Sequence, residues 1–152
     1  MISPAYLVAA LVVLLDQLTK QWALSHLRGQ GVVPLLPGLL QQRLVFNTGA
    51  AFSMLEGKAW LLGLVSGAVA LALVAWIQTS GRLRRFEWLG LGLLLGGAVG
   101  NGIDRWQRGS VVDFLEFVPI HFPVFNVADV AINLAVACLA INLLSRHGKT
   151  RS

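Results

Sequence analysis

Four long apolar runs constrain this chain more than any other feature of its sequence. They cover approximately residues 5–24, 59–77, 86–103 and 126–144. Runs of about 18 or more apolar residues are candidate membrane-spanning helices, because about 20 helical residues cross the hydrocarbon core. Only 12% of the residues are charged, whereas soluble domains carry roughly 25%. The sequence therefore predicts an all-α integral membrane protein with four transmembrane helices, in which residues 1–152 form a single domain.

The basic residues predict the orientation of these helices. A net charge of +5 is compatible with a nucleic-acid partner, but the Lys and Arg residues cluster at the ends of the apolar runs. The densest clusters lie in residues 82–85 and 146–151, and short basic segments of this kind remain in the cytoplasm. We therefore expect no nucleic-acid partner, both termini in the cytoplasm, and outer loops at about residues 25–58 and 104–125.

The first outer loop carries weak signals of regular structure. The segment LLQQRLVFNTGAAFS contains QRLVF, which is typical of a short strand, followed by an Asn-Thr-Gly turn. The next segment, AAFSMLEG, predicts one or two helical turns that lie at the membrane interface.

All four aspartates are predicted to lie in the outer half of the protein. Asp16 follows the start of the first run by eleven residues, or about 16 Å along a helix, and Lys20 lies one turn further out on the same face. Asp104 closes the third run, Asp113 lies in the second outer loop, and Asp129 opens the fourth run. A charged residue in a span costs roughly 2.5–3.5 kcal/mol on insertion scales, so such residues indicate a functional site.

Purely structural explanations compete with that hypothesis. Asp16 and Lys20 could simply pair with each other at their i,i+4 spacing. Asp104 could be an ordinary interfacial charge. Asp129 could be a first-turn acid that stabilises the positive end of a helix, with Asn126 as its N-cap.

Three glycines at four-residue spacing predict a helix-packing face. Gly92, Gly96 and Gly100 lie in an apolar run, where small residues let another helix approach closely. A dinucleotide-binding loop would instead need a βαβ unit. The same helix face reaches Asp104 one turn further on.

Asp113 and Asp129 can act together if the loop between them folds back. Two close carboxylates cannot both ionise easily, so they share a proton, which burial at the membrane edge would hold near neutral pH. The ionised carboxylate can then take a proton from an attacking water while its partner donates one to a carbonyl oxygen. A proton- or ion-coupled transporter would use similar carboxylates but needs polar groups through both leaflets. The sequence contains no H-E-x-x-H zinc motif.

Five short motifs occur in an order that resembles the bacterial lipoprotein signal peptidases, also called type II signal peptidases. These four-span aspartyl proteases are matched by DQLTK in the first span, NTGAAFS in the outer loop, GNGIDR at the end of the third span, VVDF, and FNVAD. Each motif is weak alone, and the signal comes from their order on this topology.

This resemblance implies that Asp113 and Asp129 form a catalytic dyad. It further implies substrate-binding or site-shaping roles for Asn47, Asn101, Arg105 and Asn126, and likewise for Asp16, Lys20 and Asp104. The implied substrate is a prolipoprotein whose cysteine carries a diacylglyceryl group, cut just before that cysteine at the outer face of the bacterial inner membrane. The implied fold adds an outer β-cradle and a short interfacial helix, with membrane lipids as partners, no cofactor or metal, and a monomeric chain.

Overall fold

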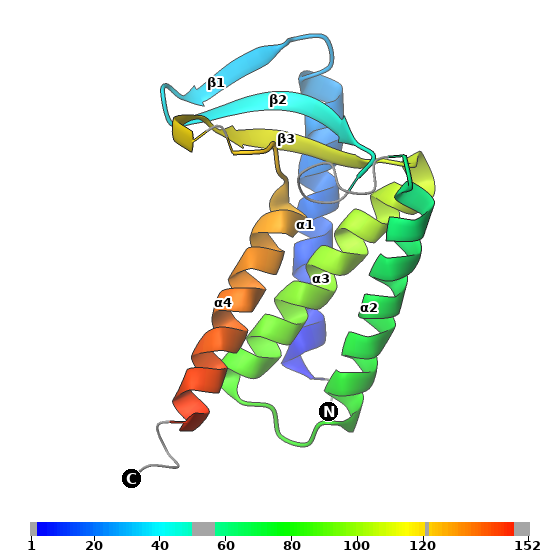
Figure 1. The fold of residues 1–152 in the computed structure, drawn as a ribbon, viewed down its shortest axis with the longest axis vertical. Helices are drawn as coiled ribbons and strands as arrows, with labels where there is room; N and C mark the ends of the chain where they lie inside the picture. Colours follow the sequence, from blue (N-terminus) through cyan, green and yellow to red (C-terminus); the bar gives the residue numbers. More distant parts are fainter. Residues whose placement is uncertain (1–2, 50–56, 121, 148–152) are drawn as a thin grey trace.

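The computed structural model describes residues 3–49, 57–120 and 122–147 (Figure 1). The helices and strands follow in the order α1 (Pro4–His26), β1 (Val32–Leu36), β2 (Leu40–Asn47), α2 (Ala59–Thr79), α3 (Arg85–Arg108), β3 (Val111–Phe117), the 3₁₀ turn η2 (Val118–Ile120) and α4 (Val127–His147). The described part of the chain has four helices that are long and apolar enough to cross a membrane. The four predicted spans are therefore confirmed as helices.

The third helix is longer than its apolar run predicts. Helix α3 continues to Arg108, five residues past the predicted end at residue 103, so Asp104 and Arg105 lie within the helix rather than at its surface end. The helix ends where Gly109 adopts a left-handed conformation (φ 70°), and its last turn carries two arginines that suit the negative helix end. The second outer loop accordingly begins near residue 109 rather than 104. The other helix ends lie within three residues of the predicted ones.

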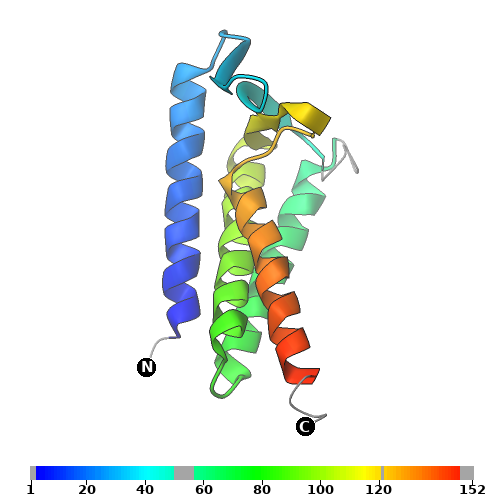
Figure 2. The ribbon, with the colours of Figure 1, turned by 90° about the vertical axis from the view of Figure 1, so that its left-hand side faces the viewer.

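Helix α3 is the central element of the bundle and packs against α1, α2 and α4. Figure 2 shows it between α1 and α2. The predicted glycine face contacts α1: a Cβ added at Gly96 would lie 2.6 Å from the Val12 Cβ, and one at Gly100 would lie 2.6 Å from Asp16 Oδ2. A Cβ at Gly92 would likewise lie 2.5 Å from a backbone oxygen of α1. The glycines are needed because the two helices touch backbone to backbone.

We expect Gly96→Ala to destabilise the protein by about 1–3 kcal/mol, the usual cost of overpacking. The new methyl would meet Val12 at 2.6 Å and the Ala9 carbonyl oxygen at 2.9 Å, and this clash should outweigh the roughly 1 kcal/mol by which alanine favours a helix. The measurement is thermal unfolding in detergent. Gly81→Ala is the control, because a Cβ there meets nothing within 4 Å among the described residues. Equal effects of the two substitutions would contradict the packing argument.

A small antiparallel sheet covers one end of the bundle (Figure 1), in the order β1-β2-β3. The predicted strand QRLVF lies inside β2, whereas β1 and β3 lie in segments that the residue pattern alone predicts only as loops. Phe114 on β3 packs with Ala23 and Leu27 near the end of α1, which fixes the sheet on the bundle. The predicted interfacial helix at residues 50–57 lies almost wholly outside the described residues.

The pairing of β2 with β3 brings polar groups from two distant segments together. Val45 pairs with Asp113 and Asn47 pairs with Val111. The sheet thereby places Asn47 beside Asp113, above the start of α4.

Candidate active site

The structure brings the two candidate catalytic carboxylates to one cavity. Asp113 comes from β3 and Asp129 from the first turn of α4, and both line a cavity of about 500 Å³. Its other polar lining residues are Asn47, Ser66, Asn101, Arg105 and Asn133. Apolar side chains of α2, α3, β3 and α4 and of residues 122–125 form the rest of the wall. The site therefore combines a pair of acids with an apolar chamber.

Asp113 is held by two asparagines and is only 2% exposed. The Nδ2 of Asn47 donates to its Oδ2 at 3.0 Å, and the Nδ2 of Asn126 donates to its Oδ1 at 2.7 Å. Both carboxyl oxygens thus have a donor, and the orientation of the carboxyl group is fixed.

Asp129 takes part in a reciprocal helix cap. The Asn126 side-chain oxygen accepts from the Asp129 backbone N–H at 3.0 Å, and Asp129 Oδ2 accepts from the Asn126 backbone N–H at 3.1 Å. Asn101 also donates to Asp129 Oδ1 at 2.9 Å. The capping alternative is therefore correct, but it is incomplete. The Asn126 amide group that caps α4 also binds Asp113, so one side chain contacts both acids.

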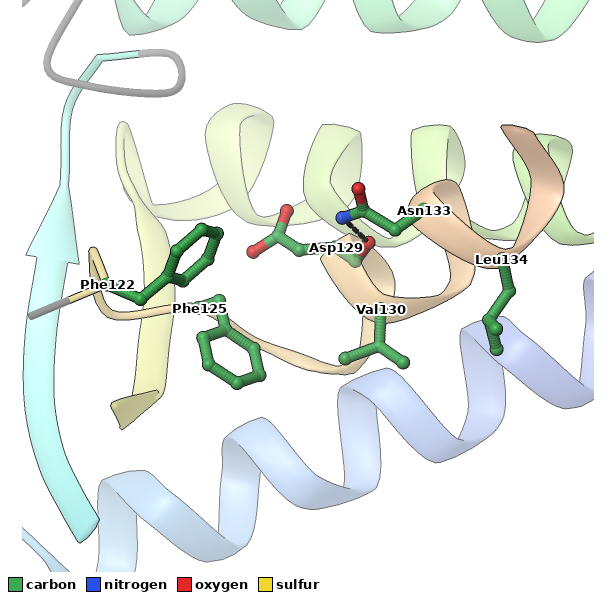
Figure 3. Close-up of a pocket in the computed structure, with 6 residues that line it drawn as sticks. All are labelled: Phe122, Phe125, Asp129, Val130, Asn133 and Leu134. Atoms are coloured by element: carbon green, nitrogen blue, oxygen red, sulfur yellow. Dashed lines mark hydrogen bonds between the residues drawn. The ribbon is translucent and has the colours of Figure 1, made fainter. Parts of the chain in front are cut away.

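The first two turns of α4 carry polar side chains on one side and apolar side chains on the other. In Figure 3, Asp129 and Asn133 lie on the side toward α3, while Val130 and Leu134 point the other way. A second cavity of about 270 Å³ adjoins Asp129 and is lined by these four residues with Phe122 and Phe125.

Burial raises the pKa of Asp113 from 3.8 to about 7, and the nearby carboxylate of Asp129 adds to the increase. Hydrogen bonds from Asn47 and Asn126 and the positive charge of Lys20 oppose it. This carboxyl group therefore keeps its proton up to nearly neutral pH. The sharing of one proton between the two acids stays a prediction.

We expect Asp113→Asn to gain stability relative to the wild type as pH rises from 4 to 8. Because the folded-state pKa of about 7 exceeds the unfolded value of 3.8, the unfolded state loses its proton first. Ionisation therefore destabilises the fold progressively from about pH 4 to pH 7. Asparagine removes this penalty, although its amide fits the two asparagine donors less well at every pH. The measurement is thermal unfolding across the pH range, and a difference in stability that does not change with pH would contradict the prediction.

A group of buried charges lies beside the cavity. Lys20 Nζ is 2.8 Å from Asp16 Oδ2 and 3.0 Å from Asp104 Oδ2, and it donates to Asn101 Oδ1 at 2.9 Å. Asp104 also pairs with Arg108 at 2.9 Å. The expected Asp16–Lys20 pair exists, but it belongs to a larger group. The interpretation of Asp104 as an interfacial charge is wrong, because this side chain is fully buried.

Arg105 points away from this group of charges and lines the cavity. It donates to Ser66 Oγ and to the Gly49 carbonyl oxygen, both at 3.4 Å. Its buried Nε finds no hydrogen-bond partner among the described residues.

Some lining residues were not predicted from the sequence. Asn133 follows Asp129 by four residues and so shares its helix face, a signal that could have identified it. Ser66 lies in an uncharged span, where a lone serine carries little information. Among the described residues, no three His, Cys, Asp or Glu side chains gather in a way that could hold a metal ion.

Comparison with known proteins gives consistent matches over nearly the whole chain. The family described as "Signal peptidase (SPase) II" matches residues 8–145. The chain is 49% identical over 149 residues to a lipoprotein signal peptidase of Parasynechococcus marenigrum, covering 98% of this chain and 94% of that protein. It is 51% identical over 140 residues to one of a Synechococcus species, covering 91% and 93%.

A solved structure gives the same result for the fold. It is described as a bacterial membrane enzyme, is 30% identical in sequence, and superposes with a TM-score of 0.89 over 98% of this chain and 92% of the other. These matches confirm the resemblance found in the sequence and the multi-pass membrane fold. They favour a peptidase over a transporter.

Proposed function

This chain belongs to the signal peptidase II family of aspartic peptidases, and on that basis we propose that it removes the signal peptide from diacylglyceryl-modified prolipoproteins with Asp113 and Asp129 as its acid–base pair. The observation that carries the assignment of these two residues is their position in one cavity, joined by Asn126. Cleavage falls just before the lipidated cysteine.

The two carboxyl groups act as the general acid and the general base. We assign the starting proton of the pair to Asp113, because burial and the neighbouring Asp129 raise its pKa to about 7, and Asp129 then serves as the ionised partner. Asp129 takes a proton from water as the water oxygen attacks the scissile carbonyl carbon, and Asp113 donates its proton to the carbonyl oxygen. The tetrahedral intermediate then breaks its C–N bond. Asp129 returns its proton to the departing amine of the cysteine, and Asp113 regains the proton of the collapsing hydroxyl group.

The polar groups of the cavity wall hold the extended peptide. A peptide leaves its helical form to be cut, and its backbone groups are then unpaired in an apolar setting, which is costly. Arg105 lines the cavity and is suited to bind one backbone carbonyl. Asn47 and Asn126 lie beside the dyad and orient it toward the peptide.

The membrane position of the site follows from the substrate. The signal peptide and the lipid on its cysteine are both apolar and reach the enzyme by lateral diffusion. We place the sheet and the dyad at the outer face of the bacterial inner membrane, with both termini in the cytoplasm, because the basic residues cluster at the opposite end. The chain acts as a monomeric, single-domain enzyme that requires membrane lipids as its surroundings and no cofactor or metal.

Dependence on the lipid tests this substrate assignment. Purified protein in detergent is incubated with two prolipoprotein peptides that differ only in the diacylglyceryl group on the cysteine, and the products are identified by mass spectrometry. We expect cleavage of the lipidated peptide alone, with a lipidated amino-terminal cysteine in the product. Equal cleavage of both peptides, or cleavage at another bond, would refute the proposal.

A further inference from the structure

Two buried carboxylates bind the backbone immediately next to the two dyad residues. Asp16 Oδ1 accepts from the N–H of Ala128, the residue before Asp129, at 3.0 Å. Asp104 Oδ2 accepts from the N–H of Val112, the residue before Asp113, also at 3.0 Å. Each dyad aspartate is therefore fixed through its neighbouring peptide unit by an acid from another element.

One lysine joins these two carboxylates. Lys20 Nζ lies 2.8 Å from Asp16 Oδ2 and 3.0 Å from Asp104 Oδ2. All three side chains are at most 1% exposed, so they have little freedom to move. The third contact of Lys20, at 2.9 Å, is to Asn101, which in turn donates to Asp129.

We propose that Asp16, Lys20 and Asp104 form a positioning clamp that sets the distance between the two dyad carboxyl groups. This proposal rests on the proposed function. The dyad residues belong to different elements, β3 and α4, and both elements contact α1, which carries Asp16 and Lys20. Lys20 and the two carboxylates thereby link the Val112 N–H to the Ala128 N–H through two ion pairs and two hydrogen bonds.

The clamp acts on catalysis through position and not through contact with the substrate. None of its three residues is among the described residues that line the cavity. Acid–base catalysis requires both carboxyl groups to reach the same water and carbonyl, and a displacement of about 1 Å can cost on the order of 10²-fold in rate. Loss of the clamp should therefore lower kcat and leave KM unchanged.

The experiment measures kcat and KM per folded molecule for Lys20→Met on a diacylglyceryl prolipoprotein peptide. We expect kcat to fall on the order of 10²-fold with an unchanged KM. Because this variant leaves two buried carboxylates without their cation and can misfold, the charge-balanced Asp16→Asn/Lys20→Met variant is measured beside it. The amide introduced by Asp16→Asn keeps an oxygen for the Ala128 N–H, while the lysine bridge to Asp104 is lost. The same fall in kcat is expected.

Arg108→Gln is the matched control. Arg108 pairs with Asp104 Oδ1 at 2.9 Å, whereas the Val112 N–H binds the other oxygen. This variant removes an ion pair from the same carboxylate without removing the clamp, and its kcat should remain that of the wild type.

A purely structural role would reduce the folded fraction and leave kcat per folded molecule unchanged. A wild-type kcat in a folded clamp variant, or a loss confined to KM, would overturn the proposal. The asparagine variants of Asp113 and Asp129 distinguish a failure of the clamp proposal from a failure of the proposed function. If they are inactive while the clamp variants keep full kcat, only the clamp is wrong. If they remain active, the proposed mechanism itself is wrong.

Discussion

Replacing Asp113 or Asp129 by asparagine is expected to lower peptide cleavage by on the order of 10²–10⁴-fold, the range attributed to general acid–base catalysis. Asparagine fills nearly the same space but can neither take a proton from water nor donate one to the carbonyl oxygen. The two residues act as one unit, so the double variant should lose little more than either single variant. The measurement is kcat/KM on the diacylglyceryl peptide.

Glu116→Gln provides the matched control for loss of a carboxylate. Glu116 lies on β3 three residues after Asp113, where it contacts Arg43 at 3.4 Å and accepts from Gln41 at 2.9 Å. It does not belong to the described cavity wall, so this variant should cleave at the wild-type rate. Near-wild-type cleavage by a folded Asp113→Asn or Asp129→Asn protein would show that a different group performs the chemistry.

The membrane-spanning helices could be predicted because their signal is local. An apolar run of about 20 residues has few alternatives in a bilayer, and the spacing of Gly92, Gly96 and Gly100 follows the helical repeat. The end of α3 could not be read in the same way. Asp104 and Arg108 look like the end of a span by polarity, yet they pair with each other and Asp104 is buried. A hydropathy profile does not register this pairing of charges, because it depends only on residue types.

The remaining part of the site depends on contacts between distant residues. Strand β3 consists of VVDFLEF, whose apolar residues give no sign of a partner strand more than sixty residues earlier. The bond from the Ala128 N–H to Asp16 spans 112 positions. Short motifs identified which side chains matter, but only the fold shows that Asn126 links both acids. Residue types also do not show which backbone N–H groups, such as that of Val112, bind a distant side chain.

We expect Asn126→Ala to reduce cleavage more than it reduces stability. This change removes the 2.7 Å bond to Asp113 Oδ1 and the 3.0 Å cap on the Asp129 N–H, so the Asp113 carboxyl group loses a fixed partner and the backbone of Asp129 loses its cap. Loss of a helix cap costs about 1 kcal/mol, which a chain of this kind should tolerate. Misplacement of the dyad should cost on the order of 10²-fold in kcat/KM.

Asn126→Ser separates the two roles of this side chain. Serine is a good N-cap, so its hydroxyl oxygen can still accept from the Asp129 N–H, but it lacks the amide donor that reaches Asp113. Thermal unfolding should therefore return toward the wild-type midpoint, while cleavage should remain close to that of Asn126→Ala. If serine restored cleavage together with stability, Asn126 would act only as a helix cap. The division of roles, in which one amide both starts α4 and orients Asp113, would then have to be abandoned.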